Sequence, residues 1–110
     1  MPLMHGDSIA QRWPTFSFAF QMANIGTDVA RALESKGMPE KSRAALARAL
    51  ELLSLTITNT HGALRQELCR TREALAASYD GTESRLADLE YLTRYFDPFL
   101  LLASTERRRP

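Results

Sequence analysis

The residues best suited to chemistry form a polar stripe in the first third of the chain. Asn24, Asp28 and Arg31 follow one another at intervals of four and three, which places them on one face of a helix over two turns. An amide, a carboxylate and a guanidinium can hydrogen-bond to one another. If a second helix covers the stripe, these side chains line an interior cleft; if none does, the stripe is a solvated face. Three charged residues from later segments are candidates to complete such a cleft: Glu51, Arg72 and Glu73.

Catalysis through histidine has little support in the sequence. His5 lies in an N-terminal arm and His61 lies in a predicted turn. His61 is followed by Gly-Ala-Leu-Arg at a helix start, whereas helical phosphotransfer domains place the histidine inside a helix before Leu-Lys-Gly or a close variant. Helical RNA nucleases need an arginine shortly before a histidine on a late helix, and neither histidine has one. The sequence therefore predicts no catalytic residue.

Metal and cofactor sites lack their sequence patterns as well. A di-metal helical bundle would show Glu-x-x-His pairs on inward faces, and the sequence has no such pair. Cys69 is the single cysteine, so it has no CxxC partner, and we interpret it as a small residue at a helix boundary. No glycine-rich phosphate loop stands between a strand and a helix. We therefore expect neither a metal nor a cofactor.

Composition indicates one ordinary globular domain. The chain has 110 residues, of which 45% are hydrophobic and 25% charged, a balance that argues against intrinsic disorder. A formal net charge of +1 gives no strong field to hold nucleic acid or a membrane. One cysteine cannot form an internal disulfide and favours a reducing compartment. No apolar run approaches the ~20 residues of a membrane span, and no signal peptide is recognisable. We expect a cytoplasmic protein that does not contact membranes.

Arginine outnumbers lysine by twelve to two, a bias that suits phosphate recognition because guanidinium is the better bidentate donor. Acidic residues interleave with these arginines, so intrahelical pairs such as Arg70–Glu73 and Asp28–Arg31 are the simpler explanation. A basic C-terminal tail over 104–110 contains the one true cluster, Arg107–Arg109, which adds little affinity for nucleic acid at physiological salt. RNA binding is therefore an alternative and not the leading hypothesis.

The elements that must position the polar stripe are helices. Hydrophobic residues recur at intervals of three and four, and no segment alternates with period two over a useful length. Four segments show the helical spacing: 14–36, 39–58, 62–79 and 83–96. Three breaks separate them: Gly37-Met38-Pro39, where Gly37 suits a left-handed helix stop, Asn59–Gly62 and Asp80–Thr82. Asp97-Pro98 then restarts a short terminal helical segment. We predict an all-α fold, an antiparallel four-helix bundle over 13–103, preceded by an arm of uncertain order at 1–12.

The first segment carries more apolar surface than one bundle helix needs. A core face holds Phe18, Met22, Ile25, Val29 and Leu33, and a second apolar surface holds Phe16, Phe20, Ala23 and Ala30. An arc this wide exceeds the ~100° that a surface helix needs, so the helix is central to the bundle or shared with a partner. We predict a two-fold homodimer whose interface includes Trp13, Phe16, Phe20, Leu52 and Leu55. Alternatively, the N-terminal arm folds back over this surface with Leu3, Met4 and Ile9.

Three runs of the sequence resemble a set of small bacterial all-α proteins of unassigned function. The runs are Met22-Ala-Asn-Ile-Gly-Thr-Asp-Val-Ala-Arg31-Ala, Arg48-Ala-Leu-Glu-Leu-Leu-Ser-Leu-Thr-Ile57 and Leu64-Arg-Gln-Glu-Leu-Cys-Arg-Thr-Arg-Glu73. The resemblance covers residues 13–99. It implies a stand-alone cytoplasmic helical protein and brings no catalytic residues.

The leading functional prediction is a non-catalytic interaction or assembly protein. The sequence names no protein partner other than a second copy of the chain. Two alternatives stay open: a small ligand-binding or enzymatic bundle that uses the polar stripe, and an RNA-binding helical domain.

Overall fold

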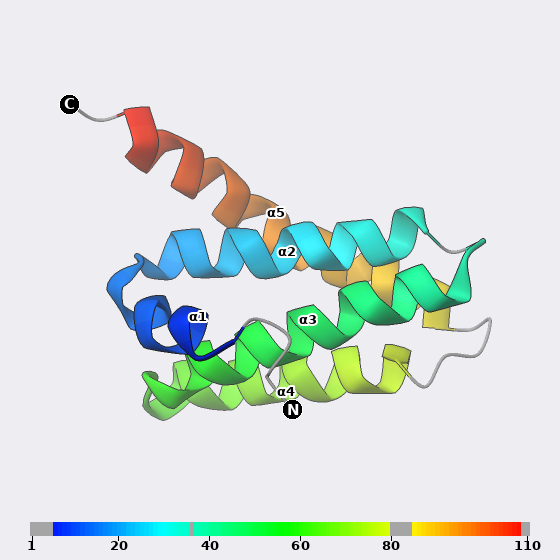
Figure 1. The fold of residues 1–110 in the computed structure, drawn as a ribbon, viewed down its shortest axis with the longest axis horizontal. Helices are drawn as coiled ribbons and strands as arrows, with labels where there is room; N and C mark the ends of the chain where they lie inside the picture. The colour runs from blue at the N-terminus through cyan, green and yellow to red at the C-terminus, as the bar shows by residue number, and fades with distance from the viewer. Residues whose placement is uncertain (1–5, 36, 80–84, 109–110) are drawn as a thin grey trace.

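A computed structural model describes residues 6–35, 37–79 and 85–108. The elements in these ranges are α1 (Gly6–Arg12), the 3-10 turn η1 (Trp13–Thr15), α2 (Phe18–Glu34), α3 (Pro39–Thr58), α4 (Gly62–Tyr79) and α5 (Arg85–Arg108) (Figure 1). The described ranges contain no strand, which confirms the all-α prediction.

The second and third predicted helices coincide with α3 and α4 at both ends. Pro39 begins α3 in the first turn, where backbone N–H groups have no acceptor within the helix, so the lack of an N–H in proline costs no hydrogen bond. Gly62 begins α4 with a φ of 61°, a conformation that glycine adopts without steric strain. The left-handed stop expected at Gly37 is wrong, because Gly62 is the glycine with positive φ in the described ranges. α2 instead ends at Glu34, where the backbone N–H of Ser35 bonds to the Arg31 carbonyl at 3.0 Å.

The first predicted helix begins later than expected. Phe16 is extended and separates η1 from α2, and the Ser17 hydroxyl caps α2 by accepting a 3.1 Å hydrogen bond from the Phe20 backbone N–H. Residues 6–12, expected within an arm of uncertain order, form α1, and Ile9 packs against the core. The fold-back alternative is therefore supported at Ile9, while Leu3 and Met4 lie outside the described residues.

The break expected at Asp97-Pro98 is wrong, because α5 continues through Pro98 to Arg108 as one helix. Pro98 lacks the N–H that would bond to the Arg94 carbonyl, and its ring crowds that carbonyl. On either side of it, however, Phe96 is fully buried and Phe99 packs against the core. Burial on both sides holds the helical path, so the predicted terminal segment is the second half of α5, which packs against the first half of α2.

α2 is the central helix of the structure. It packs against α3 on one side and α5 on the other, while α4 contacts both α3 and α5 (Figure 1). The largest fully buried side chains are Phe96, Met22, Ile25, Leu53, Leu68, Leu75 and Val29. The central position of α2 explains the wide apolar arc predicted for the first helix. Other elements of the same chain cover much of both of its apolar surfaces.

α2 and α5 approach each other closely at Gly26. A Cβ atom on Gly26 would lie 2.6 Å from the Cβ of Phe96 and 3.2 Å from its Cγ. Such distances are well below van der Waals contact between carbon atoms. The missing side chain at Gly26 therefore sets the separation of the two helices.

Candidate functional site

Gln21, which precedes Asn24 by three residues on α2, belongs to a closed hydrogen-bond network. The indole N–H of Trp13 donates to Thr56 Oγ1 at 2.8 Å, and the Thr56 hydroxyl donates to Gln21 Oε1 at 2.9 Å. The Gln21 amide nitrogen donates to the backbone carbonyls of Trp13 at 2.9 Å and Phe16 at 3.0 Å. Trp13, Gln21 and Thr56 are all buried, so each finds inside the protein the partner that a buried polar group requires. The network ties η1 to α2 and α3.

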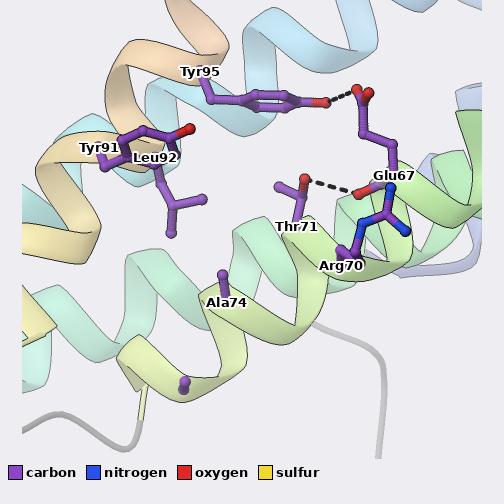
Figure 2. Close-up of a pocket in the computed structure, with 8 residues that line it drawn as sticks. Glu67, Arg70, Thr71, Ala74, Tyr91, Leu92 and Tyr95 are labelled. Atoms are coloured by element: carbon purple, nitrogen blue, oxygen red, sulfur yellow. Dashed lines mark hydrogen bonds between the residues drawn. The ribbon is translucent and has the colours of Figure 1, made fainter.

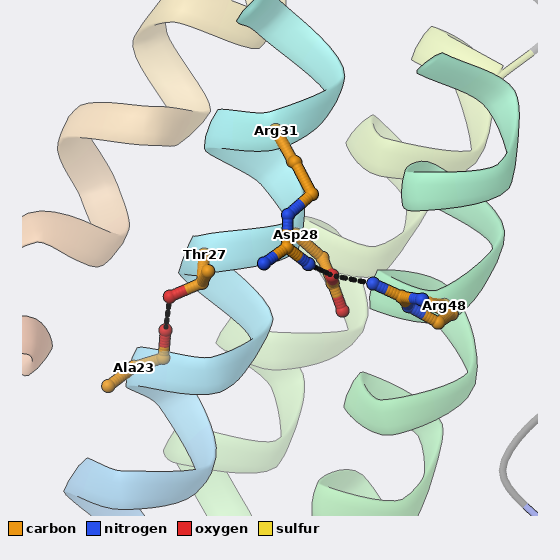
Figure 3. A network of polar contacts seen from close by, with 5 residues as sticks. All are labelled: Ala23, Thr27, Asp28, Arg31 and Arg48. Atoms are coloured by element: carbon orange, nitrogen blue, oxygen red, sulfur yellow. Dashed lines mark hydrogen bonds and ion pairs between the residues drawn. The ribbon is translucent and has the colours of Figure 1, made fainter. Parts of the chain in front are cut away.

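Two turns further along α2, Asp28 forms ion pairs with two arginines. Its Oδ1 accepts hydrogen bonds from Arg48 Nη2 on α3 at 3.0 Å and from Arg31 Nη1 at 3.2 Å (Figure 3). The Asp28 side chain is 7% exposed, whereas those of Arg48 and Arg31 are 38% and 56% exposed. The carboxylate is thus buried beneath two guanidinium groups that reach solvent. A carboxylate at this depth needs such paired cations.

A hollow of about 230 Å³ adjoins these ion pairs. Its lining residues come from α1, η1, α2 and α3: Ile9, Trp13, Asn24, Thr27, Asp28, Arg31, Arg48 and Leu52. Asn24 and Thr27 each donate to a backbone carbonyl one turn earlier in α2, those of Phe20 and Ala23. The lining therefore combines charged and hydrogen-bonding side chains with apolar ones.

The structure brings together three of the six residues predicted for the polar cleft. Asn24, Asp28 and Arg31 all line the hollow. The alternative of a fully solvated stripe is contradicted, because Asp28 is buried.

The other three predicted cleft residues lie elsewhere. Arg72 is exposed on α4, where its Nε donates to Ser54 Oγ at 2.7 Å. Glu73 is exposed on the same helix, and Glu51 is half-buried on α3. None of them is among the residues that line the hollow.

Sequence reasoning missed Arg48, which it did not group with the polar stripe. The signal lies in the turn between the two helices. Met38 stands at the middle of the predicted break, and Asp28 and Arg48 lie ten residues before and after it. When the chain reverses at this turn, residues at equal distances from it meet, which brings the carboxylate of α2 to the guanidinium of α3.

The residues predicted for a dimer interface are mostly engaged within the chain. Trp13 and Leu52 are buried. Phe16, Phe20 and Leu55 are half-buried; Phe16 and Leu55 pack against the core, and the rings of Phe16 and Phe20 lie 4.8 Å apart. The chain itself therefore covers part of this surface.

Exposed apolar surface lies on α5 instead. Tyr91, Leu101 and Leu102 are 71%, 72% and 53% exposed. Pro98, also exposed, follows Tyr91 by seven residues and precedes the two leucines by three and four, so that all four share one side of the helix. We call Tyr91, Pro98, Leu101 and Leu102 the α5 apolar face. The run Leu100-Leu101-Leu102 is its sequence signal, because three consecutive leucines span too wide an arc for one core to bury.

A second hollow, of about 380 Å³, lies between α4 and α5 (Figure 2). At one end the Tyr95 hydroxyl donates to the Glu67 carboxylate at 2.5 Å, and the Thr71 hydroxyl donates to the Glu67 backbone carbonyl at 3.0 Å. Burial and the hydrogen bond to Glu67 raise the pKa of Tyr95 from 10.0 to about 12. At neutral pH the hydroxyl is therefore a proton-bearing donor, which is unsuited to act as a base. Apolar side chains form much of the remaining lining: Ala74, Ala77, Tyr91 and Leu92.

Within residues 6–35, 37–79 and 85–108, no group of three or more His, Cys, Asp or Glu side chains is placed to hold a metal ion. In the same ranges, no helix has both the length and the apolar character needed to cross a bilayer. His61 is exposed before α4 and Cys69 is an exposed free thiol on it, while His5 lies outside the described residues. Comparison of the chain with known protein families, with curated proteins and with solved structures finds no match. Its function is therefore inferred from its own geometry.

Proposed function

We propose that this protein is a non-catalytic interaction protein that assembles with a second copy of itself through the α5 apolar face. The observation that carries the proposal is the exposure of Tyr91, Leu101 and Leu102 on one side of a single helix. Complete burial of a leucine side chain contributes about 1.5–3 kcal/mol, so covering this face favours association. The two leucines lie in the second half of α5, where their exposed side chains are open to a second chain.

The scaffold of this face, in our proposal, is the antiparallel four-helix bundle expected from the sequence, made of α2–α5. Pairwise packing supports it: α2 contacts α3 and α5, and α4 contacts α3 and α5, so the four helices close a ring. Short connections join α2 to α3 and α3 to α4, as is usual for neighbouring helices that run in opposite directions. Such a bundle anchors α5 through Leu89, Leu92 and Phe96 and leaves Leu101 and Leu102 exposed.

Two-fold association is the simplest arrangement for this face. In a two-fold contact each chain contributes the same residues, so an apolar surface is buried against its own copy. From Tyr91 to Leu102 the face is about 17 Å long at ~1.5 Å per residue. A stable interface buries about 800 Å² on each partner, so the contact must extend beyond these four residues. Phe20, half-buried beside Leu100 and Arg107, offers adjoining surface from α2.

Catalysis has weaker support than association. The buried carboxylate of Asp28 is bonded to two arginines, and the raised pKa of Tyr95 keeps its proton in place at neutral pH. A cytoplasmic location is part of the proposal because Cys69 is an exposed free thiol, which an oxidising compartment would leave open to pairing between chains. Fractionation of the source cells tests that part independently.

Light scattering after size-exclusion chromatography tests the assembly. The chain has a mass of 12.4 kDa, and we expect twice that mass at micromolar concentration. The double variant Leu101→Glu, Leu102→Glu should run as a monomer with unchanged far-UV circular dichroism, because both side chains are exposed. Leu64→Glu is the control, since Leu64 is exposed on α4 and should leave the dimer intact. A wild-type monomer at all concentrations, or a dimer that survives the double variant, contradicts the proposal.

A further inference from the structure

The hollow beside Asp28 carries one positive charge in excess. Arg31 and Arg48 supply two positive charges and Asp28 supplies one negative charge. Among the described residues that line the hollow, the others are uncharged: Ile9, Trp13, Asn24, Thr27 and Leu52. One negative charge on a ligand would balance the site. The charge of the hollow therefore favours a monoanion over a neutral or cationic molecule.

Most hydrogen-bond donors of the two guanidinium groups are not used by Asp28. Each guanidinium carries five N–H donors, and Asp28 Oδ1 takes one from each. In the described part of the chain, neither arginine bonds to another acceptor. Both side chains also reach solvent, so a ligand can approach them without displacing a helix.

Asp28 holds these donors in place before any ligand arrives. Because Arg31 and Arg48 bond to the same carboxylate oxygen, their guanidinium groups lie side by side although they come from different helices (Figure 3). Groups that are already ordered lose less entropy on binding. Two adjacent guanidinium groups suit a carboxylate, whose two oxygens accept N–H bonds in parallel.

The apolar part of the lining selects for an apolar body. Trp13, Ile9 and Leu52 line it, and the Trp13 N–H is already bonded to Thr56, so this indole contributes carbon surface and no free donor. The volume of about 230 Å³ is below the ~300–1,000 Å³ typical of pockets for drug-sized ligands. We propose that this hollow binds a small organic monocarboxylate, with its carboxylate on Arg31 and Arg48 and a compact apolar body against Trp13. This binding site is separate from the α5 apolar face.

Fluorescence titration tests the proposal, because Trp13 is the single tryptophan of the chain and lines the hollow. The probe is cyclohexanecarboxylate, which does not absorb where tryptophan is excited. Cyclohexanecarboxamide, its neutral isostere, and inorganic phosphate are titrated at the same ionic strength. We expect a saturable change with the carboxylate alone. No saturation by about 10 mM, equal binding of the carboxamide, or tighter binding of phosphate would overturn the proposal.

Variants then test whether the carboxylate binds to Arg31 and Arg48. Arg31→Gln and Arg48→Gln should each weaken cyclohexanecarboxylate binding by about tenfold or more, since each removes a charge-assisted donor. Arg48→Lys keeps the charge but lacks the planar fork, so it should bind with intermediate affinity. Arg72→Gln, on α4 and away from the hollow, is the matched control and should bind like the wild type.

The fold of each variant is checked by far-UV circular dichroism. If Arg48→Gln does not fold, Arg31→Gln decides the question, because the Arg31 side chain is the more exposed of the two. Wild-type affinity in every folded arginine variant of the hollow would overturn the assignment.

Discussion

Between α2 and α3 polar side chains are buried and bonded, whereas on the end of α5 apolar side chains are exposed. In the first region the Trp13 network and the Asp28 ion pairs fix how the two helices meet, because each buried polar group is satisfied in one arrangement. In the second region Leu101 and Leu102 contribute little to the core of their own chain. The difference indicates that specificity of folding and capacity for association are placed in separate parts of this small protein.

The largest effect that we expect comes from Thr56→Val, which breaks the polar region at its centre. Valine keeps the shape of threonine but leaves the Trp13 N–H and the Gln21 carbonyl oxygen without partners in the core. Two such unsatisfied groups destabilise the fold by about 2–4 kcal/mol. Urea unfolding measures the loss. Thr58→Val, at an exposed position two residues later on α3, is the control. Equal stability of the two variants would show that the network does not hold α2 to α3.

Gly26→Ala tests the apolar contact of α2 with α5. At an open helical position alanine would gain up to ~1 kcal/mol over glycine in helix propensity. Here the added Cβ would lie 2.6 Å from the Cβ of Phe96, which is fixed to the backbone of α5, so the helices must separate. Overpacking of this kind costs about 1–3 kcal/mol, and we expect a net loss in thermal unfolding.

Gly37→Ala is the matched control for that substitution. Nothing lies within 4 Å of a Cβ at Gly37, and its φ is not positive, so the variant should unfold like the wild type. Stabilisation by Gly26→Ala would mean that α5 is free to move away from α2.

Asp28→Asn should have a smaller effect than Thr56→Val. It keeps the shape of the side chain but leaves Arg31 and Arg48 without their counter-charge. Because both guanidinium groups are more than one-third exposed, solvent screens them, and we expect a loss of about 1 kcal/mol. Asp97→Asn, at an exposed position on α5, controls for the loss of one negative charge. Identical denaturation curves for the two variants would make the ion pairs irrelevant to stability.

The effect of Tyr95, at the contact between α4 and α5, depends on pH and is confined to the alkaline range. Its pKa is about 12 in the folded chain and 10.0 for an ordinary tyrosine, so folding favours the protonated form. This stabilisation is complete below pH 10 and is lost as the pH rises toward 12. Wild-type stability should therefore fall more than that of Tyr95→Phe over this range.

Absorbance of the ionised phenols during an alkaline titration, with the curve of Tyr95→Phe subtracted because the chain has three tyrosines, gives the pKa of Tyr95. Glu67→Gln should lower that pKa, because it removes both the negative charge and the carboxylate acceptor of the hydroxyl. An unchanged titration in Glu67→Gln would show that the hydrogen bond between α4 and α5 is not formed in solution.

Helix boundaries could be predicted where the signal is local. Pro39 starts α3, and the break over Asn59–Gly62 separates α3 from α4, so both helices were found from neighbouring residues alone. Pro98 gives an equally local signal for a break, yet α5 passes through it. Burial of Phe96 and Phe99 decides the outcome there, and burial is a tertiary property that helical spacing does not reveal.

The same distinction applies to the candidate site. Asn24, Asp28 and Arg31 were found together because their positions follow from the period of one helix. Arg48 depends on how two helices pair across a turn, which the spacing within either helix does not contain. Glu51 and Arg72 were grouped with the stripe by charge alone, and the packing of α3 and α4 places them away from the hollow.

Pro98 also divides α5 into two parts whose backbone amide hydrogens should exchange with solvent at different rates. The helix lacks one backbone hydrogen bond at this point, since proline has no N–H to give to the Arg94 carbonyl. Beyond it, Phe99, Ala103 and the 2.6 Å hydrogen bond from Ser17 to Glu106 hold the segment against α2. The segment with the fewest stabilising contacts unfolds locally first. We therefore expect the last turns of α5 to exchange their amide hydrogens through a local unfolding that leaves the core folded. A partner seated on the leucines would slow that exchange.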